Sequence, residues 1–103
     1  MRVVDGRASI STDILAGYAA DAAREVDGVR ALVESRRHRH RGVRVNGESG
    51  AHRFEVHVET EWGASIPDVA REVQQRVRDY LARMADVEAE AVDVVVDDVG
   101  PAA

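Results

Sequence analysis

The 103-residue sequence predicts a small α+β domain in which two helices lie on one face of a mostly antiparallel sheet of three to four strands. Three patterns lead to this prediction. Two segments space their apolar residues three and four apart, one segment alternates strictly between apolar and charged residues, and one valine-rich segment lies near the end. The resulting order is (β)-α-β-β-α-β. The length fits a single domain over residues 1–103, with residues 100–103 as a tail.

A first helix is expected after a short extended piece at residues 7–10. Residues 11–13, Ser-Thr-Asp, supply a hydroxyl cap and an acidic side chain for the positive end of the helix dipole. Gly28 is the expected stop, because glycine takes the left-handed conformation without a steric penalty. The expected apolar face consists of Ile14, Leu15, Tyr18, Ala19, Ala22 and Val26.

An interrupted strand and an alternating strand are expected next. The first covers residues 29–35, is broken by an arginine-histidine run at residues 36–41, and resumes at residues 42–45. A turn at residues 46–50 leads into the alternating strand, which ends near residues 62–63. Its period of two predicts one buried and one solvent-facing side. The buried side is expected to hold Phe54, Val56 and Val58, and the solvent-facing side Glu55, His57 and Glu59.

A second helix and a last strand complete the predicted fold. Ser65 and Asp68 have the spacing of a capping box, and Pro67 is tolerated in a first helical turn. An apolar stripe then runs from Ile66 to Met84 over five turns. The last strand covers residues 91–99, with Val92, Val94 and Val96 on one side and Asp93 and Asp97 on the other. With both helices on one side of the sheet, the other side is left open.

The charge of the chain excludes several classes of protein. The net charge is −5, and all 14 basic residues are arginine. Residues 1–53 have a balance of +3 and residues 54–103 a balance of −8, so total charge argues against bulk nucleic-acid binding. The absence of cysteine excludes disulfides, thiolate metal sites and cysteine catalysis. No apolar stretch fits a secretory signal or a membrane span, which predicts a cytoplasmic location.

The arginine-histidine run is the first candidate interaction surface. Its guanidinium groups are able to grip the phosphates of nucleic acid or anionic lipid, or an acidic surface of another protein. The alternative interpretation of the run is a solvated loop between two strand segments that binds nothing. No aromatic residue interleaves the run, so the stacking that favours single-stranded nucleic acid is missing. This surface comprises Arg36, Arg37, His38, Arg39, His40, Arg41 and Arg44.

An acidic surface is the second candidate, on the open side of the sheet. Residues 86–98 hold six acidic groups, Asp93 and Asp97 among them, and no basic group. These acids are able to meet the arginine run of a neighbouring copy, in a head-to-tail contact that salt weakens. The candidate acidic surface comprises Glu55, Glu59, Glu61, Asp93 and Asp97.

Other chemistries have less support in the sequence. Residues 47–50 spell the G-x-x-G of K-homology RNA-binding domains, but they fall between two strands, which favours a hairpin turn. Two sets of side chains are candidate metal ligands: His38 with His40, and His57 with Glu55 or Glu59. Neither set has a third ligand at a fixed spacing, so no metal or cofactor is expected. The serines occupy caps, turns and strand ends, and the carboxylates form a solvated row, so no enzyme is expected. The imidazoles leave a pH-responsive role open.

Three ordered segments resemble the bacterial alkaline shock protein family, also called the general stress or envelope stress response family. The first segment is residues 6–11, the first helix and the sequence Glu-Val-Asp-Gly-Val at residues 25–29. The second is the strand of residues 55–63. The third is the sequence Ile-Pro-Asp-Val-Ala at residues 66–70, followed by the last strand. The resemblance implies a small cytoplasmic protein linked to cell-envelope stress. Some family members self-associate, and some lie near the membrane through a partner with a transmembrane anchor. The resemblance implies no catalytic residue.

The combined expectation is a non-enzymatic protein-binding or scaffold domain. It is expected to be cytoplasmic, to self-associate as a homo-oligomer, and to lie at the inner face of the membrane through a partner such as a membrane-anchored paralogue. The alternative is a small nucleic-acid-binding domain that uses residues 36–41.

Overall fold

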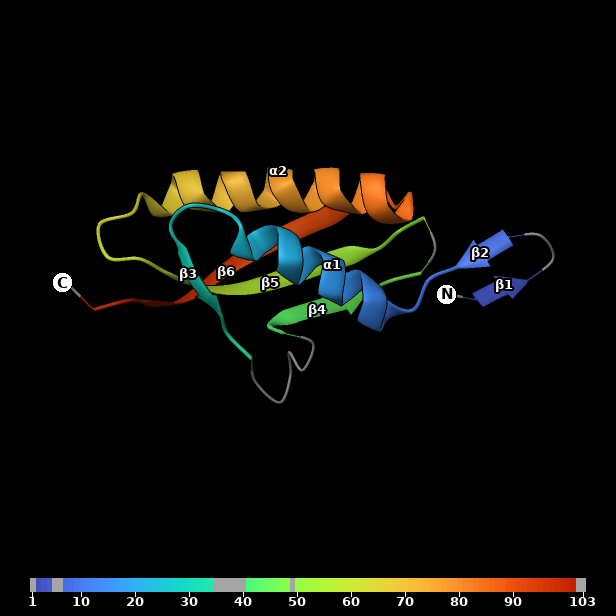
Figure 1. The fold of residues 1–103 in the computed structure, drawn as a ribbon, viewed down its shortest axis with the longest axis horizontal. Coiled ribbons are helices and arrows are strands. Elements are labelled where there is room, and N and C mark those ends of the chain that lie inside the picture. The colour runs from blue at the N-terminus through green and yellow to red at the C-terminus, as the bar shows by residue number, and fades with distance from the viewer. Residues whose placement is uncertain (1, 5–6, 35–40, 49, 102–103) are drawn as a thin grey trace.

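The computed structural model describes residues 2–4, 7–34, 41–48 and 50–101, with only the backbone of residues 2–4 and 7–9. Figure 1 shows two helices beside a twisted sheet, with a separate short hairpin at the N-terminal end. The elements are β1 (Arg2–Val4), β2 (Arg7–Ser9), α1 (Thr12–Arg24), β3 (Val29–Leu32), β4 (Val43–Asn46), β5 (Arg53–Thr60), α2 (Ile66–Ala85) and β6 (Ala91–Val99). The predicted α+β architecture and its element order are confirmed, and the hairpin of β1 and β2 precedes them.

Strand β5 forms the centre of the sheet, with a different partner on each edge. On one edge, β4 pairs antiparallel with its first half and β3 antiparallel with its second half. On the other edge, β6 runs parallel along its whole length. The prediction of antiparallel pairing therefore holds for β3 and β4, and β6 departs from it because α2 carries the chain back to the starting end of β5.

The predicted interruption of the edge strand is confirmed at atomic detail. The Val33 N–H donates to the His57 carbonyl and the His57 N–H donates to the Gly42 carbonyl, each at 2.9 Å. Gly42 has a φ of 84°, and a Cβ atom there would lie 3.0 Å from the Val33 backbone. The chain thus leaves the sheet after Val33 and rejoins it at Gly42, opposite the middle of β5. The predicted turn before β5 is also confirmed, with the Ala51 N–H donating to the Glu48 carbonyl at 2.8 Å.

Helix α1 begins where the sequence predicts and ends earlier. The Ser11 hydroxyl accepts from the Ile14 N–H at 3.3 Å, so the predicted cap is confirmed. The helix ends at Arg24, and Gly28 lies in the turn beyond it with a φ of 95°. Gly28 is therefore not the helix stop. Its Cβ position would lie 2.6 Å from Val69 Cγ2, so glycine is required there for the close approach of this turn to α2.

The buried face of α1 keeps Leu15, Ala19 and Ala22 of the predicted face, and Val26 beyond the helix is buried as predicted, but the face is rotated away from Ile14. Ile14, expected in the core, is 37% exposed, whereas a row of alanines is buried. Small side chains let a helix approach its neighbours closely, which explains why the alanines face the core and the bulkier Ile14 is left at its border. The two helices also meet through an edge-to-face contact of Tyr18 and Tyr80, with ring centroids 5.8 Å apart. The buried residues of α1 are Leu15, Ala16, Ala19, Ala20, Ala22 and Ala23.

Helix α2 follows the predicted stripe in its middle and departs from it at both ends. Its buried residues recur every fourth position and face the same core as Phe54 of β5. Ile66 and Met84, at the two ends, are 41% and 47% exposed. The predicted capping box is wrong, because the Ser65 side chain makes no cap hydrogen bond and Asp68 pairs with Arg71. The buried residues of α2 are Val69, Val73, Val77 and Leu81.

Both helices pack on one side of the sheet, through the residues of β5 that the alternating pattern assigns to the core. Phe54, Val56 and Val58 are at most 1% exposed. No helix or strand of the described residues packs on the opposite side, which we call the outer face. Among the described residues, no helix is long and apolar enough to cross a membrane.

Candidate functional site

The outer face is built from alternate residues of four strands. Glu55 of β5 lies opposite Arg44 of β4 on one side and opposite Asp93 of β6 on the other. Residues that face each other across a ladder project to the same side of a sheet, so these three side chains share the outer face. Arg30, at the register shift of β3, reaches the same face, with its Nε 3.5 Å from Glu59 Oε2.

His57 lies at the centre of the outer face and is only 6% exposed, which corrects the prediction that it faces solvent. Its Nδ1 lies 2.7 Å from Asp97 Oδ2 and its Nε2 lies 2.6 Å from Glu55 Oε1. Each ring nitrogen is therefore within hydrogen-bond distance of a carboxylate oxygen of its own. We call these three residues the His57 cluster. The burial of the ring follows from these two carboxylates, which flank it.

The position of Asp97 depends on an irregularity in β6. Val96 pairs with Val58, but Glu59 pairs with Asp98, so Asp97 is the extra residue of a bulge. A bulge re-aims a side chain, and this one places the Asp97 carboxylate on His57, 40 positions away in the sequence. Nothing in the local pattern of either strand signals this contact.

The predicted acidic surface divides into two parts. Glu55, Glu59 and Asp97 are paired on the outer face with His57 or Arg30. Asp93 shares that face and is exposed, with no ion pair among the described residues. Glu61 lies beyond β5, where its N–H donates to the Gly28 carbonyl at 2.9 Å. The structure therefore brings four of the five predicted acids together and places Glu61 elsewhere.

The predicted basic surface is described only in part. Its members Arg36, Arg37, His38, Arg39 and His40 lie outside the described residues. Arg41 places its Nη2 2.7 Å from Asp21 Oδ1 on α1, and that oxygen also accepts from Arg24 at 2.8 Å. Arg44 is exposed on the outer face. The described end of this surface is thus tied to α1 and to the edge of the sheet.

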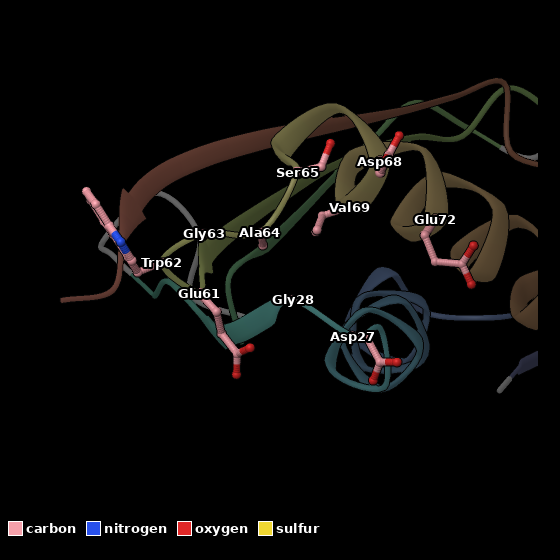
Figure 2. A pocket seen from close by; sticks show the side chains of 10 residues that line it. All are labelled: Asp27, Gly28, Glu61, Trp62, Gly63, Ala64, Ser65, Asp68, Val69 and Glu72. Atoms are coloured by element: carbon pink, nitrogen blue, oxygen red, sulfur yellow. The ribbon is translucent and has the colours of Figure 1, made fainter. Parts of the chain in front are cut away.

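A second candidate site, missed by the sequence analysis, lies where β5 passes into α2. It is a cavity of about 590 Å³ that we call the Trp62 groove (Figure 2). A smaller hollow of about 300 Å³ lies beside Trp62 and is lined by Arg30, Glu61, Trp62 and Pro101. The Trp62 groove is lined by Asp27, Gly28, Glu61, Trp62, Gly63, Ala64, Ser65, Asp68, Val69 and Glu72.

The acids of the Trp62 groove differ in their partners. Asp68 pairs with Arg71, and Glu72 Oε1 lies 3.0 Å from Arg76 Nε. Asp27 and Glu61 make no ion pair with any described residue. Figure 2 shows the carboxylates of Asp27, Glu61 and Glu72 directed to one side of the groove, and that of Asp68 to the other.

The described residues hold no metal site. No group of three or more histidine, aspartate or glutamate side chains within them is arranged to hold a metal ion. In the His57 cluster, the two ring nitrogens point to different carboxylates, so the three side chains do not converge on one point.

These observations define a two-layer α+β domain with a β5-α2-β6 crossover, an uncovered outer face and a groove at one end. The chain belongs to the alkaline shock protein 23 family, described as having a cell envelope-related function, whose family model matches residues 2–101. The resemblance found in the sequence is therefore confirmed.

Solved structures with the same fold share little sequence with the chain. The manganese form of a MamM CTD variant has 15% identity and a TM-score of 0.56, covering 85% of this chain and 99% of its own. A further MamM CTD structure has 14% identity and a TM-score of 0.57, with the same two coverages. A zinc form has 15% identity and a TM-score of 0.56, covering 84% and 85%. At this identity the likeness shows the fold alone. The comparison with curated proteins gave no match.

Proposed function

We propose that this chain is a non-enzymatic scaffold domain that binds proteins, associates with its own copies, and serves a cell envelope-related function through a membrane-anchored partner. The observation that carries this proposal is the outer face. It is a whole side of the sheet without a covering helix or strand among the described residues, and its central polar side chains hold one another, His57 with Glu55 and Asp97, and Arg30 with Glu59. Such a preorganised surface suits a protein contact, because few side chains lose freedom when it binds.

The orientation of His57 supports a binding role over catalysis. A general base needs a ring nitrogen within hydrogen-bond reach of a substrate proton. Both nitrogens of His57 are directed at carboxylates of the same chain, at 2.6 and 2.7 Å. The cluster therefore serves to hold β5 and β6 together, and we assign it no catalytic step.

The distribution of charge supports head-to-tail association. The edge formed by β3 and β4 carries Arg30, Arg44 and the point where residues 36–41 join the sheet, whereas β6 forms the opposite edge with three exposed aspartates. Unlike patches at different places on one molecule form heterologous contacts, which are able to propagate from copy to copy.

The nucleic-acid alternative has no comparable support. It depends on residues 36–41, of which only Arg41 is described, and Arg41 is already paired with Asp21. Arg44 lies opposite Glu55 in the sheet. We therefore do not propose nucleic-acid binding for this chain.

Size-exclusion chromatography with light scattering tests the proposal. Exposed charges are screened beyond roughly 10 Å in 0.1 M salt and roughly 3 Å in 1 M salt. We expect a mass above that of one 11.2 kDa chain at low salt, rising with protein concentration and falling as salt is added. If the chain is a monomer at every protein concentration and salt level, the proposed self-association is wrong.

A further inference from the structure

Trp62, the only tryptophan of the sequence, lies on the surface with 66% of its area exposed. Ile66 and Val99, at the adjoining ends of α2 and β6, are 41% and 37% exposed. Tryptophan is highly buried on average and is enriched among the residues that dominate protein interfaces. An exposed tryptophan between two hollows therefore indicates a surface that a partner covers.

The charges around Trp62 select the chemistry of that partner. Asp27 and Glu61 lack an ion-pair partner among the described residues, and Glu61 lines both hollows. Arg30, the cation nearest to Trp62 in the smaller hollow, is engaged with Glu59. The groove has an aromatic ring at one end and two uncompensated carboxylates farther along it (Figure 2). This arrangement matches a run of several guanidinium groups, which stack on aromatic rings and donate paired hydrogen bonds to carboxylates.

We propose that the Trp62 groove receives residues 36–41 of a second copy of this chain, an inference that rests on the self-association proposed above. This run has four arginines in six residues and is the densest run of guanidinium groups in the sequence. Charge complementarity therefore favours it as the occupant. The partner's arginines stack on Trp62 and pair with Asp27 and Glu61.

The described attachment points of the run favour a second copy over the same chain. Its two stems, Val33 and Gly42, are bonded to His57 in the middle of β5, and Arg41 is held by Asp21 of α1. The groove lies beyond the end of β5, between the turn after α1 and the start of α2 (Figure 2). The run thus joins the sheet at the middle of β5, whereas the groove lies beyond the end of that strand, and this offset allows a head-to-tail contact between copies.

Tryptophan fluorescence tests this contact directly, since all the tryptophan emission comes from Trp62. A synthetic peptide of residues 34–41 is titrated into the full chain at low salt. We expect a saturable shift of the emission to shorter wavelength as the ring is covered. The same peptide with serine in place of its four arginines is the peptide control, and it should give no shift.

A matched pair of carboxylate variants tests whether the groove is the receiving site. Asp27→Asn with Glu61→Gln should weaken peptide binding by roughly tenfold, which is the effect of losing about 1.4 kcal/mol of contact free energy. Glu90→Gln removes an exposed carboxylate that lies before β6, has no ion-pair partner among the described residues and does not line the groove, so it should leave the affinity unchanged. Circular dichroism confirms that each variant is folded. Equal loss in both variants, or no loss in either, overturns the groove as the receiving site.

Light scattering distinguishes this inference from the proposed function. If the wild type associates and the groove variant associates equally well, the inference fails and the scaffold proposal stands. If the wild type stays monomeric, the proposed function fails, and the second-copy occupant fails with it. A Trp62 emission that is already shifted, and does not depend on protein concentration, indicates docking within one chain and also overturns the inference.

Discussion

The outer face and the Trp62 groove are both acidic, but their carboxylates are in opposite situations. On the outer face, Glu55 and Asp97 hold the buried His57. In the groove, Asp27 and Glu61 have no ion-pair partner among the described residues, and Trp62 stands exposed beside them. The difference teaches that acidic composition alone does not mark a binding surface. The acids around His57 fix the shape of the outer face, whereas Asp27 and Glu61 are free to pair with the cations of a partner.

The largest effect is expected from removing the centre of the His57 cluster. His57→Leu leaves two carboxylates facing each other around an apolar side chain, without the hydrogen bonds that the ring supplied. Hydrogen bonds to charged groups contribute about 1.5 to 3 kcal/mol each, and we expect a total loss of about 3 kcal/mol, because both carboxylates are about one-third exposed and regain contact with water. Urea unfolding measures this loss.

A triple variant checks the electrostatic cause of that loss. Adding Glu55→Gln and Asp97→Asn to His57→Leu removes both charges, so most of the lost stability should return. If the triple variant is less stable than the single one, the cluster stabilises the fold through packing and not through its charges.

The next effect concerns the shape of the groove. Gly28→Ala places a Cβ atom 2.6 Å from Val69 Cγ2 at a φ of 95°, so we expect a loss of about 2 kcal/mol in the free energy of unfolding. Gly50→Ala is the matched control, because its φ of 85° is similar but no atom lies within 4 Å of the new methyl group. Gly50→Ala should cost about half as much. Equal losses in the two variants would contradict the close approach at Gly28.

The smallest effects compare single carboxylates from the two regions. Asp97→Asn weakens a charge-assisted hydrogen bond to His57 and should cost about 1 kcal/mol. Asp27→Asn removes a charge with no ion-pair partner among the described residues, so stability should change by less than about 0.5 kcal/mol. Thermal and urea unfolding of the two variants measure the difference. A loss at Asp27 as large as that at Asp97 would abolish the contrast between the two regions.

Several parts of the fold could be predicted because they depend on short-range periodicity. The alternation of Phe54, Val56 and Val58, the cap at Ser11 and the break in the edge strand all depend on neighbours within a few residues. The candidate acidic surface was predicted in membership for four of its five residues. The pairing of these acids with His57 was not predicted. A period of two assigns His57 to the solvent-facing side, but it does not say which side chains flank the ring.

The sequence by itself determined the α+β class, the order of its elements and the face of β5 that enters the core, because apolar spacing along one segment fixes which side of it is buried. Only the tertiary structure decided the parallel course of β6, the rotation of α1 onto its alanines, the burial of His57 and the exposure of Trp62. Each of these depends on a contact, or the lack of one, between segments far apart in the chain. At the bulge in β6, Asp97 contacts His57 and stabilises the fold. Beyond the end of β5, Asp27 and Glu61 line the Trp62 groove, which we propose receives a second copy.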